Sequence, residues 1–180
     1  STQPEASINL GELAFEFNCY NPLSGGIDIA FGTGLDNRSD PEEVLILRSK
    51  IFLNWKFIRS TWLDLGLRGG GGFLGAWHDA DPAANGVDSI GRVNSFKVPF
   101  FGGVLVSLYF TDKVVFTFQT DYYINARITS WYWSEEVESE SIDEDTTTKR
   151  HKYTGWDQSK GTPEINCGGL FFTAGLKFVF

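Results

Sequence analysis

The sequence has no methionine, only two cysteines and only two histidines, and it lacks long apolar runs. Two cysteines form at most one disulfide, so a scaffold built from many disulfides is excluded. No run of about 18 apolar residues occurs, which excludes a transmembrane helix. Stretches rich in the strong helix formers Ala, Leu, Glu and Lys are nearly absent, and this argues against a helical fold. The opening "STQPEAS" is expected to be a mature N-terminus or a trimmed start.

Basic residues are also few, with 15 Lys and Arg against 23 Asp and Glu and a net charge of −8. Nucleic-acid binding needs clustered Lys and Arg, so we expect no nucleic-acid partner. Aromatic residues, in contrast, make up 16% of the chain, and there are 20 glycines. This combination predicts an all-β protein, and a length of 180 residues predicts one domain over 1–180.

Apolar and polar residues alternate along much of the chain, which is typical of β-strands that have one apolar face. In "VLILRSKIFLNWKF", for example, Lys50 and Ile51 belong to opposite faces. Ile8 and Leu10 are out of phase with the apolar residues that follow them, which predicts a bulge near Gly11. The seven strand segments are 8–20, 26–34, 44–57, 61–77, 96–110, 114–133 and 168–180.

The apolar face of such strands points inward in a soluble, lipocalin-like barrel and outward in a transmembrane barrel. Several segments run for 13 residues or more, which exceeds the usual strand of a globular protein. Short turns, "NPLSGG", "IRS" and "TDK", alternate with long polar loops at 36–43, 78–95 and 134–167. Aromatic residues gather at strand ends, as in the girdles of membrane barrels. These features predict a transmembrane antiparallel up-and-down β-barrel of about eight strands.

The last eight residues, "TAGLKFVF", follow a defined pattern: polar Thr173, then Gly175, apolar Phe178 and a final aromatic, Phe180. This pattern resembles the C-terminal assembly signal of bacterial outer-membrane proteins, and the chain resembles small barrels of the OmpA, OmpX and OmpW kind. The resemblance implies a bacterial outer-membrane location, contact with outer-membrane lipid and lipopolysaccharide, and recognition by the barrel-assembly machinery. It also implies that loss of Phe180 impairs assembly more than loss of "STQP".

Seven strands conflict with the even number of strands found in bacterial barrels. An eighth strand is expected within 135–166 or before the first segment. If the C-terminus lies at the short-turn side, the first segment runs inward and an upstream strand is needed. If the first segment runs outward instead, Cys19 and Cys167 meet at one rim, where a disulfide is expected. The sequence leaves both alternatives open.

An outward apolar face places charged residues inside the barrel, where they must be paired. We expect an ion-pair network that fills the interior and closes it to bulk flow, in preference to a narrow polar passage. The residues expected in this network are Glu12, Glu16, Asp28, Arg48, Lys50, Lys56, Asp64, Arg68, Asp121, Arg127 and Lys177.

Catalytic and metal-binding patterns are weak. His78 lies in "WHDADP" and His151 in "KRHKY", and we interpret both as solvated loop histidines. The acidic loop at 79–88 lacks the bidentate Glu of a calcium loop, so no metal or other cofactor is expected. The predicted role is membrane-structural, surface-interacting or that of a narrow conduit for small molecules. The alternatives are an outer-membrane lipid-modifying enzyme and a soluble lipocalin-like ligand-binding barrel.

Overall fold

The computed structural model describes residues 8–20, 22–38, 40–80, 91–137, 147–154, 156 and 161–179. Every regular element among these residues is a β-strand, so the predicted all-β class is confirmed. No helix in the described ranges has the length and apolar character needed to cross a membrane. The strands are β1 (Ile8–Tyr20), β2 (Leu23–Leu35), β3 (Glu43–Arg59), β4 (Leu63–Asp79), β5 (Arg92–Lys97), β6 (Phe100–Tyr109), β7 (Val114–Ile124), β8 (Arg127–Ile128), β9 (Tyr132–Val137), β10 (Thr147–Lys152), β11 (Ile165–Asn166) and β12 (Gly169–Phe178).

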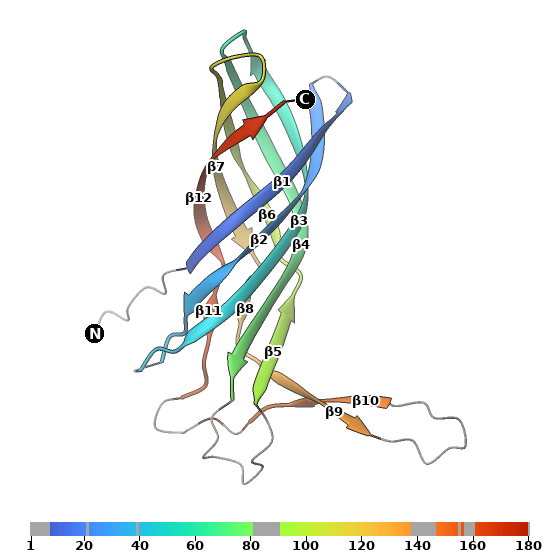
Figure 1. Cartoon of the computed structure of the whole chain (residues 1–180), viewed down its shortest axis with the longest axis vertical. Helices are drawn as coiled ribbons and strands as arrows, with labels where there is room; N and C mark the ends of the chain where they lie inside the picture. The colour runs from blue at the N-terminus through green and yellow to red at the C-terminus, as the bar shows by residue number, and fades with distance from the viewer. Residues whose placement is uncertain are drawn as a thin grey trace.

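The principal sheet is antiparallel and follows the order β1-β2-β3-β4-β6-β7-β12. β4 pairs with β6 along its first half and with β5 along its second half. β5 also pairs with β9, which forms a hairpin with β10. β8 and β11 form a separate two-stranded sheet that continues β7 and β12. The strands lie oblique to the long axis and curve around it (Figure 1). The curvature gives the sheet an inner and an outer face.

The connections differ at the two ends of the molecule (Figure 1). One end, the short-turn end, carries the tight connections β1–β2, β3–β4 and β6–β7 together with the C-terminus. Hydroxyl groups close two of these turns: the Ser60 Oγ accepts from the Leu63 N–H at 2.9 Å, and the Thr111 Oγ1 accepts from the Val114 N–H at 3.0 Å. The other end, the long-loop end, carries the longer connections and the β9–β10 hairpin.

Two breaks in the ladders have local causes. Pro99 lies between β5 and β6, because it has no N–H to donate to a ladder. Its carbonyl still accepts from the Gly72 N–H at 3.0 Å. Asn125, between β7 and β8, has a φ of 57°, and its side chain donates to the Val98 carbonyl at 2.8 Å. The two breaks lie at the same level of the sheet, because Phe100 and Ile124, which adjoin them, are register partners.

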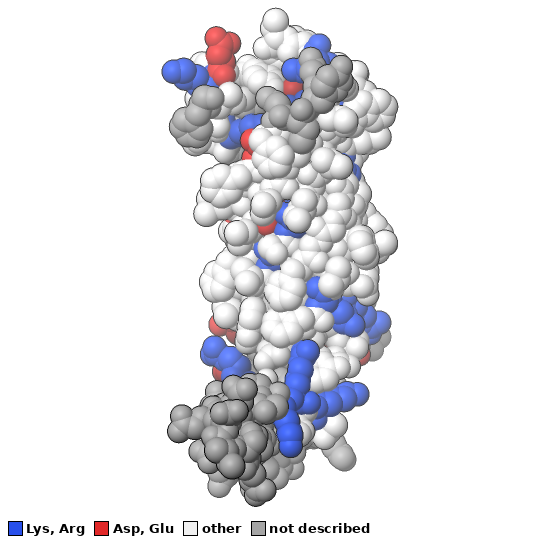
Figure 2. All heavy atoms as spheres, turned by 90° about the vertical axis from the view of Figure 1, so that its right-hand side faces the viewer, with Lys and Arg blue, Asp and Glu red and all other residues white. Residues whose placement is uncertain are grey.

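Burial is inverted relative to a soluble protein. In β3, the inward Lys50 is 2% exposed, and the next residue, Ile51, is 67% exposed. The same alternation runs along β12, where the outward Leu170, Phe172 and Leu176 are exposed. Figure 2 shows few charged atoms over the middle of the face in view, with most Lys, Arg, Asp and Glu toward the two ends. The outer face is therefore a broad apolar surface.

Two sequence-based expectations are wrong here. β1 pairs with β2 without interruption from Ile8↔Gly34 to Asn18↔Ser24, so there is no bulge near Gly11. Ile8 and Leu10 accordingly share the inner face with Glu12. A closed barrel is not found either: within the described ranges, β1 pairs only with β2 and β12 only with β7. The expected strand within 135–166 exists as β10, but it pairs with β9 and does not close the sheet.

Candidate functional site: a charged interior with one open side

The interior holds a middle layer of charged side chains centred on Lys50. Its Nζ lies 3.1 Å from Asp28 Oδ2, 3.3 Å from Asp121 Oδ2 and 3.6 Å from Glu12 Oε2. Arg48 donates to Glu12 at 2.7 Å, and Arg68 lies 3.4 Å from Asp121. We call Glu12, Asp28, Arg48, Lys50, Arg68 and Asp121 the middle layer. Each of its charges has an opposite charge beside it, as buried ions require.

Aromatic rings line this middle layer. The Arg68 guanidinium lies 4.7 Å from the Phe52 ring centre, and Arg48 lies 5.0 Å from the Tyr123 ring centre. Such contacts attract cations electrostatically and exclude water from the ion pairs. Gly103 leaves the space that this packing needs, since a Cβ there would lie 2.5 Å from Asp121 Oδ1. Charged and aromatic side chains therefore pack against one another at this level.

A second group of charges, the turn-end layer, lies toward the short turns. Lys56 is 3.3 Å from Asp64 and 3.6 Å from Glu16, and Lys177 is 2.9 Å from Glu16. The Tyr109 hydroxyl donates to Asp64 at 2.6 Å. Ten of the eleven charged residues expected inside thus lie in these two layers, with five acids facing five bases.

Arg127, the eleventh, lies elsewhere. It starts β8 at the long-loop end, its side chain is 64% exposed, and it pairs with Glu164. The expectation that Arg127 faces the interior is therefore wrong. In β7 every second residue faces the interior, but this alternation does not continue past the break at Asn125. The pattern of β7 therefore does not predict which way Arg127 points.

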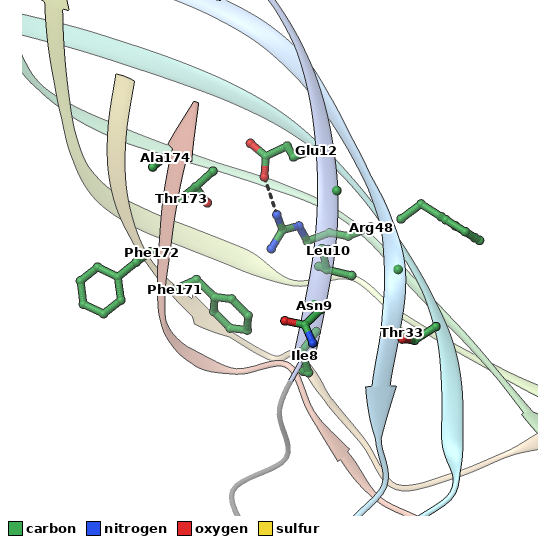
Figure 3. A pocket seen from close by; sticks show the side chains of 13 residues that line it. Ile8, Asn9, Leu10, Glu12, Thr33, Arg48, Phe171, Phe172, Thr173 and Ala174 are labelled. Carbon is green, nitrogen blue, oxygen red and sulfur yellow. Dashed lines mark hydrogen bonds and ion pairs between the residues drawn. The ribbon is translucent and has the colours of Figure 1, made fainter. Parts of the chain in front are cut away.

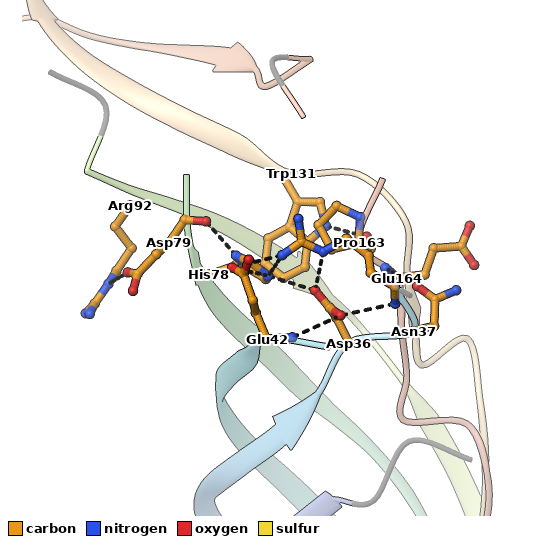
Figure 4. Close-up of polar contacts among 10 residues, drawn as sticks. Asp36, Asn37, Glu42, His78, Asp79, Arg92, Trp131, Pro163 and Glu164 are labelled. Atoms are coloured by element: carbon orange, nitrogen blue, oxygen red, sulfur yellow. Dashed lines mark hydrogen bonds and ion pairs between the residues drawn. The ribbon is translucent and has the colours of Figure 1, made fainter. Parts of the chain in front are cut away.

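A largely buried polar cluster that the sequence did not predict lies at the long-loop end (Figure 4). We call Asp36, Arg38, Glu42 and His78 the loop-end cluster. Arg38 donates to Asp36 at 2.7 Å and lies 2.9 Å from Glu42, and His78 Nε2 lies 3.0 Å from Asp36 Oδ2. Burial alone would raise the pKa of Asp36, but the hydrogen bonds from His78 and Arg38 outweigh it and hold that pKa below its ordinary value.

His78 is 1% exposed, so its interpretation as a solvated loop histidine is wrong. Its Nδ1 lies 2.6 Å from the Asp79 carbonyl and donates to it, because a carbonyl can only accept. Its Nε2 lies between Arg38, at 3.1 Å, and Asp36. Both ring nitrogens are thus engaged, and neither is free to act as a general base toward a substrate. His151 is half-buried on β10 and stacks on Trp133.

Two tryptophans cover the loop-end cluster. Trp131 and Trp156 meet the His78 ring edge-on at 5.5 and 5.2 Å. The Trp131 indole N–H donates to the Pro163 carbonyl at 2.7 Å, which anchors the segment before β11. The Glu164 N–H donates to the Asn37 side chain at 3.0 Å in the same region. These contacts join connections that are far apart in the sequence.

The sheet is open between β1 and β12, where a cavity of about 710 Å³ lies (Figure 3). Ile8, Leu10 and Glu12 of β1 border it on one side, and Phe171 and Thr173 of β12 border it on the other. Arg48 from β3 also lines the cavity, and there it forms an ion pair with Glu12. The cavity thus connects the middle layer to the open side of the sheet.

The assembly-signal residues lie on β12. Thr173 and Gly175 are half-buried on the inner side, Phe178 is 60% exposed on the outer side, and Phe180 lies outside the described residues. The cysteines do not meet. Cys19 is near the short-turn end of β1, whereas Cys167 precedes β12 at the other end and is a free, buried thiol. The disulfide expected between them is therefore wrong.

No family model matches the chain, and no curated protein or solved structure matches it either. Within the part of the chain that the structure describes, no group of three or more His, Cys, Asp and Glu side chains is arranged to hold a metal ion.

Proposed function

We propose that this protein spans the bacterial outer membrane as a curved β-sheet around an ion-paired interior, and that its role is membrane-structural. The observation that carries the proposal is the inverted burial: the middle layer is inside, while large apolar side chains such as Phe15 and Ile51 are 70% and 67% exposed. An aqueous environment disfavours an apolar surface of this extent, whereas lipid favours it. A soluble, lipocalin-like barrel needs the opposite orientation.

The length of the strands supports the same proposal. β1 and β2 have 13 residues each, and β3 and β4 have 17 each. A tilted strand needs about 9–11 residues to cross the apolar part of a bilayer. The principal strands are therefore long enough to cross it and to extend into the headgroup region on both sides.

The ion pairs favour a structural role over a conduit. A passage through the interior would have to separate Lys50 from its three carboxylates, and separating buried charges is costly. We also propose that the protein is not an enzyme, because both ring nitrogens of His78 are engaged inside the loop-end cluster. Surface interaction through the β9–β10 hairpin remains compatible with this role.

Insertion into liposomes tests the membrane proposal. We expect the folded protein to float with lipid vesicles and to need detergent in their absence. Ile51→Lys should reduce insertion, because a Lys on the lipid face costs about 2–4 kcal/mol near the bilayer midplane. Asp112→Lys, in the exposed β6–β7 turn, is the matched control and should insert normally. A wild-type protein that stays monomeric and folded without detergent, or an Ile51→Lys variant that inserts as well as Asp112→Lys, contradicts the proposal.

Conductance across planar bilayers separates the structural role from the conduit. The wild-type protein should show no steady ionic current, because the middle layer fills the interior. A steady current that the purified protein produces, and that detergent without protein does not produce, contradicts a purely structural role.

A further inference from the structure

The outer face of the sheet changes from apolar to charged near the long-loop end. On β4 this face runs from the exposed Phe73 through the half-buried Trp77 to the exposed Asp79. On β5, which pairs with this part of β4, it runs from the exposed Phe96 to the exposed Arg92. A change from aromatic to charged side chains is typical of the boundary between the hydrocarbon and the headgroups of a bilayer.

The β9–β10 hairpin starts at this boundary and leaves the sheet sideways (Figure 1). Tyr132 at the start of β9 is the register partner of Asn94 on β5, so it continues the outer face of the sheet. Lys152 is opposite Tyr132, and alternation along β10 places Arg150 on the same face. Lys149 belongs to the other face of the hairpin.

Arg150 reaches from the hairpin back over the outer face of β5. Its guanidinium lies 4.2 Å from the centre of the Tyr132 ring and 5.3 Å from that of the Phe96 ring. The Phe96 ring contacts Phe73 at 5.2 Å and Trp77 at 6.0 Å between ring centres. The hairpin and the outer face of the sheet therefore meet in a corner that holds both cations and aromatic rings. We define the hairpin corner as Phe73, Phe96, Tyr132, Arg150 and Lys152.

The cations of the hairpin corner have no acidic partner among the described residues. Arg150 and Lys152 are exposed, and neither forms an ion pair there. Arg92, on the same part of the surface, is paired with Asp79 at 3.3 Å. Glu136 shares the face of Arg150 by register but lies farther toward the hairpin tip. Figure 2 shows Lys and Arg side chains gathered just above the long-loop end, with few acidic atoms among them.

The ligand that fits the hairpin corner has a negative charge beside a hydrocarbon part. Arg150 and Lys152 are two residues apart on one face of β10, a spacing of about 6.6 Å, so one phosphate group can accept hydrogen bonds from both. The ring of Tyr132 lies against the guanidinium and limits its movement. Phe73 and Phe96 add exposed apolar surface, which a dissolved anion would leave uncovered. A phospholipid with a net negative charge satisfies both requirements.

We propose that the hairpin corner binds the phosphate group of an anionic phospholipid. Arg150 and Lys152 donate hydrogen bonds to the phosphate oxygens. Phe73 and Phe96 contact the part of the acyl chains nearest to the headgroup. This inference rests on the proposed membrane insertion, because only an inserted sheet meets acyl chains at β5. It adds a preferred lipid and a fixed depth, with the phosphate at the level where the outer face of β4 becomes charged.

Native mass spectrometry of the intact protein tests this site. The protein is inserted into vesicles of equal parts phosphatidylcholine and phosphatidic acid, transferred into a neutral detergent and weighed with the lipid that it retains. We expect the wild-type protein to retain one phosphatidic acid in preference to phosphatidylcholine, whose choline group cancels the charge of its phosphate. The double variant Arg150→Gln with Lys152→Gln should bind phosphatidic acid at least about tenfold more weakly, because it loses both charge-assisted hydrogen bonds.

The matched control removes two cations that lie outside the hairpin corner. It combines Lys149→Gln, on the other face of the hairpin, with Lys113→Gln in the exposed β6–β7 turn. Its net charge equals that of the first double variant, but its affinity for phosphatidic acid should stay within about twofold of the wild type, because distant exposed charges are screened. Inorganic phosphate at the concentration of the lipid should not displace it, since inorganic phosphate has no acyl chain to contact Phe73 and Phe96.

Three outcomes overturn the proposal. In the first, the wild-type protein retains the two lipids equally. In the second, the two double variants retain equal amounts of phosphatidic acid. In the third, inorganic phosphate displaces the lipid, which would mean that the corner binds a dissolved anion. Insertion into vesicles of phosphatidylcholine alone separates this inference from the membrane proposal: normal insertion without a lipid preference removes only the inference, whereas failed insertion of the wild-type protein removes both.

Discussion

The middle layer and the loop-end cluster are both buried groups of ion pairs, yet they are built in different ways. In the middle layer, Lys50 and its three carboxylates come from four strands that the ladders hold in register. In the loop-end cluster, Asp36 and Arg38 lie two residues apart in one connection and meet His78 near the end of β4. The sheet fixes the first group, whereas hydrogen bonds and two tryptophans fix the second. Variants of each group should therefore fail in different ways.

Lys50→Met should have the largest effect. It removes the cation that contacts Glu12, Asp28 and Asp121 together. The buried Asp28 then loses the cation with which it pairs, whereas Glu12 keeps Arg48 and Asp121 keeps Arg68. The free energy of unfolding should fall by about 3–5 kcal/mol, as measured by urea unfolding in detergent micelles. Lys113→Met, in the exposed β6–β7 turn, is the control and should unfold like the wild type. Equal stability of the two variants would mean that the middle layer does not hold the sheet together.

Asp36→Asn should have a smaller and more local effect. The amide keeps the size of the side chain but loses the charge that accepts hydrogen bonds from Arg38 and faces His78. Bonds to charged groups contribute about 1.5–3 kcal/mol each at most, and the strands remain paired. Trypsin should therefore cut the connections at the long-loop end faster in this variant, while the exchange of β3 amides stays as in the wild type. Faster exchange throughout β3 would contradict a local role.

The pH dependence of the loop-end cluster follows from Asp36. Its pKa in the folded protein lies below the ordinary 3.8, so its ionised form stabilises the folded state. That contribution is fully present above about pH 5 and is lost as the pH falls through the lowered pKa. Fluorescence of the buried tryptophans between pH 6 and pH 2 measures this change. The transition should be absent in Asp36→Asn, and an identical transition in that variant would assign it to another group.

The sequence predicted the middle layer because strict alternation fixes which face each residue occupies. Once Ile51 is assigned to the outer face of β3, Lys50 must point inward. No such rule applies to Asp36 or Arg38, because apolar and polar residues do not alternate in the connection that contains them. One sequence signal for their burial is the presence of Trp156 within an otherwise polar segment, since large aromatic side chains seek a core.

Closure of the sheet could not be predicted from the alternation either. The pattern says which face a residue occupies, but it does not say whether the first and last strands run in the same direction. The relative direction of the first and last strands depends on the number of strands between them. The alternation did not settle that number, because the break at Asn125 and the β9–β10 hairpin lie in or next to the stretch where an eighth strand was expected. The predicted pairing of Cys19 with Cys167 failed for this reason.

Trp131→Phe should weaken the loop-end cluster by less than Asp36→Asn does. It keeps most of the aromatic contact with His78 but loses the N–H that donates to the Pro163 carbonyl at 2.7 Å. One buried hydrogen bond contributes about 1 kcal/mol. Cleavage by trypsin after Lys160, the tryptic bond nearest to Pro163 in the sequence, should become moderately faster. Trp62→Phe, whose indole is 61% exposed, should leave this rate unchanged.

Arg127→Ala should have the smallest effect, although the alternation placed Arg127 with the interior bases. Its ion pair with Glu164 is exposed to solvent and to screening by salt, so the free energy of unfolding should fall by at most about 1 kcal/mol. The small difference should shrink further as the salt concentration rises. Arg68→Ala, which removes a guanidinium that is almost fully buried beside Asp121, should cost several times more and should respond little to salt. Urea unfolding of the two variants at low and high salt measures both differences. Equal losses would place Arg127 inside the sheet, in a position equivalent to that of Arg68.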